Sequence, residues 1–220
     1  MAEQTKNSLK SSRKRAGRDP ERSRLALIEA TLDTLAEEGL SDTSVSRIIA
    51  RAGVSRGMIH LHFGGKDNLI GAAAELFANR YFDEMECQMA PAAGDPVATI
   101  LAIIRADLGE ALLNERSVAI WHALRGAARR NPAIALHSDT RDRKLRKMIF
   151  DSFCQLDTSP AEADAYRLAN DATLGTLALL EGMWTDFMVH PEAFSRQDAT
   201  RIILRFINGL YSETFSADET

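Results

Sequence analysis

Two short helical segments joined by a very tight turn limit the folds that are open to this chain. The segments span about residues 43–52 and 55–63, and only Gly53 and Val54 separate them. Glycine allows the backbone of a sharp turn, and Ser55 is a residue type that caps helix starts. This arrangement predicts a helix-turn-helix unit. The positions spaced to face inward are Val45, Ile48, Ile49, Ile59 and Phe63.

The second of these segments has an outward face that suits the major groove of DNA. Aliphatic side chains on such a face can contact thymine methyl groups, whereas the alternative is a helix packed against another protein surface. The residues on this face or at its edges are Arg56, Gly57, Met58, His60, Leu61 and His62. The remaining residues predicted to contact operator DNA are Thr43, Ser55, Lys66 and Arg15.

The charge of the chain is divided unevenly along its length. Residues 1–70 carry 12 Lys and Arg against 9 Asp and Glu, whereas residues 71–220 carry 15 against 22. Most of the basic excess lies in residues 1–18, which therefore resemble an arm that contacts a polyanion. A solvated tail without a partner is the alternative for this arm.

Nearly every other long segment has helical spacing of apolar residues. No useful strand-like alternation and no hairpin turn signal is present, so the sequence predicts an all-α fold of about nine helices. The predicted divisions are a basic arm (1–18), a helix-turn-helix domain (19–65) and a ligand-binding and dimerisation domain (66–220). The helices expected after the first three span about residues 66–89, 95–113, 116–130, 132–156, 159–190 and 195–215.

The spacing of Thr43, Gly53, Ser55, Gly57 and Phe63 follows a known pattern without gaps. By this pattern residues 20–80 resemble the tetracycline-repressor (TetR) family of regulators. The family pattern departs from this chain at Ile49, where it has a small residue, and at His60 and His62, where it has aromatic residues. The resemblance implies a homodimeric repressor that a small molecule releases from a palindromic operator. The matching positions are Thr43, Val45, Ile48, Ala52, Gly53, Val54, Ser55, Gly57, Phe63, Lys66 and Leu69.

The last two predicted helices carry apolar faces that suit a dimer. In the TetR family the two C-terminal helices pair with their copies as a four-helix bundle, and the alternative is a core within one chain. A monomer would read one half-site only, whereas an operator normally needs two. The residues predicted for the dimer interface are Leu174, Leu177, Ala178, Gly182, Ile203, Phe206, Ile207 and Leu210.

The region 179–184 resembles the choline-responsive BetI branch of the family. Glu181 and Trp184 are three residues apart and share a helix face, and Trp121 could form a second wall. A carboxylate beside an indole can hold a quaternary ammonium such as choline. The alternatives are that the tryptophans belong to the core and that Glu181 pairs with an arginine across the dimer.

Other kinds of site find little support in the sequence. The histidines show no metal-ligand spacing, and no nucleophile motif or Gly-rich phosphate loop is present, so we expect no metal, no cofactor and no enzyme activity. The two cysteines, Cys87 and Cys154, are far apart in the sequence, which favours free thiols in the cytoplasm. The sequence also has no apolar stretch of the ~18 residues that a membrane span needs, so we expect a cytoplasmic protein. The alternative functions are a ligand-independent architectural DNA-binding protein and a helical enzyme.

Overall fold

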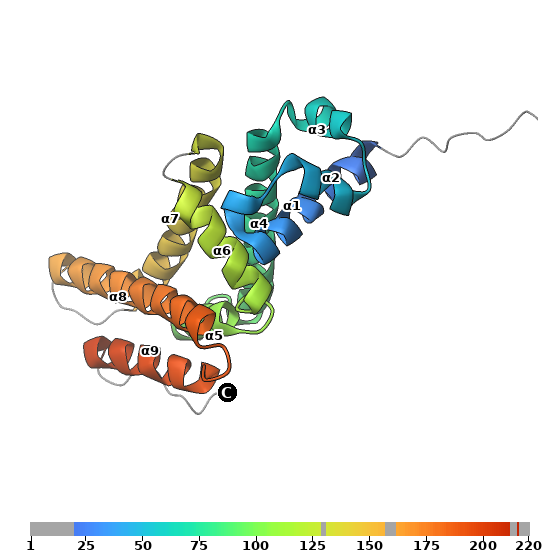
Figure 1. Cartoon of the computed structure of the whole chain (residues 1–220). Helices are drawn as coiled ribbons and strands as arrows, with labels where there is room; N and C mark the ends of the chain where they lie inside the picture. The colour runs from blue at the N-terminus through green and yellow to red at the C-terminus, as the bar shows by residue number, and fades with distance from the viewer. Residues whose placement is uncertain (1–19, 129–130, 157–161, 212–214, 216–220) are drawn as a thin grey trace, which may run out of the picture.

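The structure is a computed structural model that describes residues 20–128, 131–156, 162–211 and 215. Every regular element in these ranges is a helix, which confirms the predicted all-α class (Figure 1). The first four helices are α1 (Pro20–Asp42), α2 (Val45–Ala52), α3 (Arg56–Phe63) and α4 (Lys66–Met89). After the 3₁₀ turn η1 (Ala90–Ala92) come α5 (Pro96–Leu108), α6 (Glu115–Ala128), α7 (Pro132–Cys154), α8 (Glu162–Val189) and α9 (Arg196–Tyr211).

Side-chain caps begin two of the long helices where the sequence predicts them. The Asp95 carboxylate accepts a hydrogen bond from the backbone N–H of Ala98 at 3.0 Å. The Asn131 side chain accepts one from the backbone N–H of Ala133, also at 3.0 Å. A proline follows each cap and already has the φ angle of a helix. The start of the helix predicted from about residue 159 lies outside the described residues.

Two glycines end regular helical backbone. Gly39 has φ 69° and ψ 178°, so the helical conformation breaks there, although α1 is assigned to Asp42. Gly109 ends α5 at Leu108, whereas the sequence predicted a helix to about Leu113. The prediction was wrong because Gly109 is extended (φ −69°, ψ 156°) and the backbone N–H of Leu113 returns to its carbonyl at 2.7 Å.

The buried side chains form two hydrophobic clusters. The first contains residues of α1 to α3, the first half of α4, three residues of α6 and Ile134 of α7. The second contains the rest of α4 together with residues of α5 to α9. Phe77 of α4 is partly buried and packs against both clusters. Helix α4 therefore belongs to both cores.

Ion pairs join α1 to the helices beneath it. Arg80 of α4 pairs with Glu29, and Arg116 of α6 pairs with Asp33 at 2.7 Å. All four side chains keep a third or more of their surface exposed, so each pair is worth only about 0–1 kcal/mol. We call these four residues the α1 clasp.

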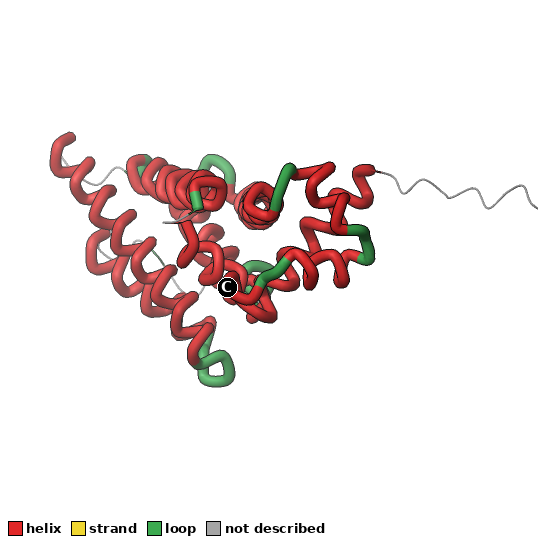
Figure 2. The backbone as a smooth tube through the Cα atoms, turned by 45° about the horizontal axis from the view of Figure 1, so that its top comes forward, coloured by secondary structure: helices red, strands yellow, loops and turns green. Residues whose placement is uncertain are grey.

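Helices α8 and α9 lie side by side at the end of the molecule opposite α3 (Figures 1 and 2). The Phe206 ring of α9 lies against Gly175 of α8, where an added Cβ would be 2.0 Å from Cζ of that ring. Only glycine fits this crossing with Phe206 in its present place. Across the described ranges no helix is long and apolar enough to span a membrane, and no three His, Cys, Asp or Glu residues are grouped to hold a metal ion.

Candidate nucleic-acid interface and ligand cavities

Helix α3 is held in place by the turn that precedes it and by its inner face. Gly53 adopts the left-handed conformation (φ 62°) that the sharp turn requires. Ile59 and Phe63 are buried in the first cluster, as the sequence predicted. Ser55 occupies the N-cap position with no capping hydrogen bond from its side chain, whereas Ser44 caps α2 by accepting from Arg47 N at 3.3 Å. The exposed Ser55 is thus not the side-chain cap that we expected.

The outer face of α3 is narrower than the sequence suggested. Leu61 is 74% exposed, and Arg56, Gly57 and His60 are exposed beside it. Met58 is partly buried and packs against the first cluster. We expected Met58 on the open face, and that expectation was wrong because its side chain packs against the first cluster.

Two further residues predicted to contact DNA are less exposed than we expected. Thr43 is 1% exposed, and its hydroxyl donates to the Gly39 carbonyl oxygen at 2.6 Å, so its side chain closes the end of α1 and offers no DNA contact here. His62 is partly buried, and its Nε2 is buried with no hydrogen-bond partner in the described residues. The prediction for Thr43 is wrong, since a side chain enclosed by its own chain cannot reach a groove, whereas His62 keeps part of its surface exposed and stays a prediction.

Most of the basic side chains near α3 are already engaged within the chain. Arg47 pairs with Glu38, Arg51 pairs with Glu37, and the Lys66 ammonium donates to the Thr43 carbonyl oxygen. The hydrogen bond from Arg51 holds the pKa of the Glu37 carboxyl below its usual value, so that acid stays charged. Lys66 therefore links the start of α4 to the loop before α2 through this hydrogen bond.

Arg56 is the basic residue best placed on the outer face of α3. It is exposed, and its Nη2 donates only to the hydroxyl of Ser46, at 3.2 Å, among the hydrogen bonds of the described residues. Arg15, which the sequence placed among the DNA contacts, lies outside the described residues. The face is therefore formed by Ser55, Arg56, Gly57, His60 and Leu61.

The C-terminal helices present a partly apolar outer surface. Leu174 of α8 and Ile202 of α9 are each 42% exposed, and Ala178 and Gly182 are exposed on α8. Leu177, Phe206 and Leu210 are half-buried. These side chains remain available to a second copy of the chain.

Two residues predicted for the dimer interface face the other way. Ile203 and Ile207 are both 0% exposed and lie in the second cluster of their own chain. Their assignment to an interface was therefore wrong. Ile202, which the sequence analysis did not select, takes the outward position one residue earlier. Helical spacing marks buried positions without saying which chain buries them.

A cavity of about 270 Å³ lies between α5, α6, α7 and α8. Its wall includes Trp184 and Glu181, as expected, and also a buried carboxylate, Asp107 of α5. The Trp184 indole Nε1 donates to Asp107 Oδ2 at 2.9 Å, and the Tyr81 hydroxyl donates to Asp107 Oδ1. Asp107 is 2% exposed, so its carboxylate and the Trp184 indole form the buried part of the wall, and Tyr81 bonds to Asp107 without lining this cavity.

The acid beside the indole is thus Asp107 and not Glu181. Glu181 pairs with Arg125 of the same chain at 3.4 Å, near the surface. Trp121 does not line the cavity, because it is buried behind Trp184 with ring centroids 6.5 Å apart. Asp107 and Tyr81 were not predicted as site residues, and Arg105 two residues before Asp107 makes the charged end of α5 look ordinary in the sequence.

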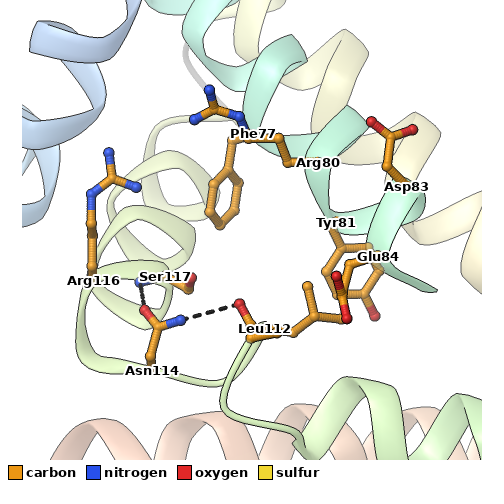
Figure 3. Close-up of a pocket in the computed structure, with 10 residues that line it drawn as sticks. Phe77, Arg80, Tyr81, Asp83, Glu84, Leu112, Asn114, Arg116 and Ser117 are labelled. Atoms are coloured by element: carbon orange, nitrogen blue, oxygen red, sulfur yellow. Dashed lines mark hydrogen bonds between the residues drawn. The ribbon is translucent and has the colours of Figure 1, made fainter. Parts of the chain in front are cut away.

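A second and larger cavity, of about 520 Å³, lies between α4, the 109–114 turn and the start of α6 (Figure 3). Its wall includes Phe77 and Leu112, and also the two arginines of the α1 clasp, Arg80 and Arg116. Its lining also includes the carboxylates of Asp83 and Glu84, which lie on α4 as Arg80 does. The ring of Tyr81 lines this cavity while its hydroxyl bonds to Asp107, so Tyr81 stands between the two cavities.

Two family models match the chain. The model for bacterial regulatory proteins of the tetR family matches residues 27–73, and the model for the C-terminal region of BetI-type transcriptional repressors matches residues 96–212. The HTH-type transcriptional regulator BetI of Stenotrophomonas maltophilia strain R551-3 is 26% identical over 182 residues, which are 83% of this chain and 89% of that protein.

Solved structures have the same arrangement of helices. A putative transcriptional regulator from Pseudomonas aeruginosa PAO1 superimposes with a TM-score of 0.77 at 29% identity, covering 88% of this chain and 92% of that one. A putative transcriptional regulator from Saccharomonospora viridis, solved in complex with choline, superimposes with a TM-score of 0.70. Its identity is 16%, over 86% of this chain and 96% of that one, so it is similar in fold alone.

Proposed function

The chain belongs to the TetR family of bacterial regulatory proteins and carries a BetI-type C-terminal domain, and on this premise we propose that it is a homodimeric repressor that a small cation releases from its operator. Its family and curated relatives are helix-turn-helix transcriptional regulators and not enzymes. The observation that carries the proposal is the outer face of α3, where Arg56, His60 and Leu61 are all exposed on one short helix. A helix with this face can enter a major groove.

The chemistry of the α3 face fits operator DNA. The Arg56 guanidinium can donate two hydrogen bonds to a guanine edge or to a phosphate. Leu61 can contact a thymine methyl group, and its 74% exposure is otherwise unfavourable in water. Gly57 lets the backbone approach the groove closely because it lacks a side chain.

Replacing Arg56 or His60 by alanine is expected to weaken operator binding by about 5- to 150-fold each, the range for losing a base contact of about 1–3 kcal/mol. The measurement is a mobility shift on DNA from the intergenic region beside the gene, with competitor DNA present. Both side chains are exposed, so circular dichroism should show an unchanged fold.

Arg201→Ala is the matched control, because Arg201 is an exposed arginine on α9, at the end of the molecule far from α3. It should bind the operator as the wild type does. Operator affinities of Arg56→Ala and His60→Ala equal to that of the control would rule out the proposed docking of α3.

A dimer would place two α3 helices on the two half-sites of a palindromic operator. The support for a dimer is the exposed apolar surface of α8 and α9 around Leu174, Ala178 and Ile202. Small residues at 178 and 182 allow another helix to approach closely. Successive half-sites lie about 34–36 Å apart, so the dimer must hold its α3 helices at about that separation.

The cavity beside Asp107 is the best-supported effector site. The Asp107 carboxylate and the Trp184 indole in the wall of this cavity can attract a quaternary ammonium through charge and cation–π contact, worth about 0.5–2 kcal/mol for the aromatic part. The solved relative from Saccharomonospora viridis is a choline complex, which favours the same ligand class here. Tyr81 joins this site to α4, which leads directly to α3. A ligand that moves Tyr81 would thereby tilt α4 and change the separation of the α3 helices.

Asp107→Asn is expected to raise the choline concentration needed for operator release by about tenfold or more, since the variant loses the negative charge near the ammonium. The measurement is fluorescence anisotropy of labelled operator during a choline titration. The uncharged isostere 3,3-dimethyl-1-butanol should release little DNA from the wild type. Asp142→Asn, at an exposed acid of the same cavity wall, is the matched control and should respond nearly as the wild type does.

Two outcomes would contradict the cation site. One is an equal response of the wild type to choline and to its uncharged isostere. The other is an Asp107→Asn variant that responds to choline normally. If no small molecule affected operator binding, the data would favour the alternative function, a ligand-independent architectural DNA-binding protein.

A further inference from the structure

The larger cavity has other lining residues than the effector site, and it lies beside the helix that both hydrophobic clusters share. It adjoins Phe77, the residue of α4 that packs against both hydrophobic clusters. Its volume of about 520 Å³ is within the range of about 300–1,000 Å³ that small-molecule sites occupy. Two of its lining residues also belong to the α1 clasp.

Opposite charges lie on opposite sides of this cavity. Figure 3 shows the guanidinium groups of Arg80 and Arg116 on the side facing α1, and Asp83 and Glu84 on the other side. The Phe77 ring projects between them. A ligand with one charge would meet attraction at one wall and repulsion at the other, whereas a ligand that carries both charges would satisfy both.

The charged groups have capacity left for a ligand. A guanidinium has five N–H donors, and the contacts of Arg80 and Arg116 with Glu29 and Asp33 use only two donors of each. The Glu84 carboxylate accepts from the Gln88 amide at 2.9 Å through Oε1, and its other oxygen can accept as well. A carboxylate can therefore share the arginines without displacing the acids of α1.

The middle of the cavity is apolar. The rings of Phe77 and Tyr81 and the side chain of Leu112 line it. An apolar group of the ligand would be taken out of water there, which is favourable in proportion to its buried area. An α-amino acid with a large apolar side chain carries both charges and an apolar group, so it could contact the arginines, the carboxylates and the apolar surface together.

We propose that this cavity is a second ligand site, distinct from the cation site, and that it binds zwitterionic α-amino acids with apolar side chains. The ligand carboxylate pairs with Arg80 and Arg116, its ammonium pairs with Glu84 and Asp83, and its side chain packs on Phe77. Because the same arginines hold Glu29 and Asp33, the bound ligand also acts on the contact between α1 and α4.

The test uses three probes with the same apolar body. Isothermal titration calorimetry on the full chain compares L-phenylalanine, 3-phenylpropanoate, which lacks the ammonium, and 2-phenylethylamine, which lacks the carboxylate. L-phenylalanine should bind with a Kd about tenfold or more below that of each analogue, since each analogue lacks one charge-assisted contact.

Three variants locate the site. Arg116→Gln and Glu84→Gln should each weaken L-phenylalanine binding by about tenfold or more, because each removes one charged partner. Glu84 lies outside the α1 clasp, so Glu84→Gln keeps the test valid if Arg116→Gln does not fold. Asp107→Asn is the control, and it should lose choline response while keeping L-phenylalanine binding.

The proposal fails if L-phenylalanine gives no binding heat, if the three probes bind equally, or if a folded Glu84→Gln protein binds L-phenylalanine as tightly as the wild type. None of these results bears on choline release, so the cation site and this site can fail separately. If the Asp107→Asn protein keeps L-phenylalanine binding and the Glu84→Gln protein loses it, the cation site and the amino-acid site are separate.

Discussion

Replacing Trp184 by alanine is expected to lower the free energy of unfolding by about 3–5 kcal/mol. The side chain is 3% exposed in the second cluster, and its indole N–H is one of the donors to the buried Asp107 carboxylate. Its removal leaves a cavity and takes a hydrogen bond from a buried charge. The melting temperature should fall by about 6–20 °C, as measured by circular dichroism.

Two further variants separate packing from hydrogen bonding at this position. Trp184→Phe keeps an aromatic ring but no N–H, so it should cost about 1–3 kcal/mol. Asp186→Ala, at an exposed residue of the same helix, should leave the melt almost unchanged. A Trp184→Ala melt close to that of Asp186→Ala would mean that this side chain is not part of the core. Since the alanine variant loses both stability and function, Trp184→Phe is the better probe of effector response.

Leu174→Glu is expected to yield a monomer whose operator affinity is lower by about 10²-fold or more, since linked half-site binding is lost. Leu174 is 42% exposed on α8, so a glutamate does not disturb the core of its own chain, but it would bury a charge in a dimer interface. Sedimentation velocity gives the oligomeric state, and a mobility shift on the operator gives the affinity.

The matched control is Leu136→Glu, the same change at a leucine of α7 that is 62% exposed and lies outside α8 and α9. This variant should sediment and bind operator as the wild type does. A Leu174→Glu protein that remained a dimer would place the interface elsewhere, and it would leave the α3 docking model to be judged on Arg56 and His60 alone.

The sequence was sufficient for the order and type of the helices because those features depend on local signals. Asp95 and Asn131 cap helices through neighbours two or three residues away. Gly53 takes the left-handed turn that its position requires. The end of α5 was misplaced because the apolar run through Leu113 is compatible with a helix, and only the tertiary packing decides that the chain turns at Gly109.

The sites were less predictable because they depend on contacts between distant segments. The hydrogen bond from Trp184 to Asp107 joins residues 77 positions apart, and no local pattern marks it. Periodicity correctly identified Ile203 and Ile207 as buried, yet it could not tell a core within one chain from an interface between two chains. The prediction that Met58 lies on the open face was wrong for a related reason, since the sequence of one helix does not show which of its residues the neighbouring helices cover.

The sharing of α4 between the two hydrophobic clusters has a consequence for how the protein unfolds. Leu69, Ile70 and Ala73 complete the first core, and Tyr81 and Met85 of the same continuous helix complete the second. A fragment that ended at residue 65 would leave the inner faces of α1 and α3 partly uncovered, and it would also lack the α6 residues that pack on them. Because neither core is complete without α4, heat should remove both in a single cooperative transition, with calorimetric and van't Hoff enthalpies that agree.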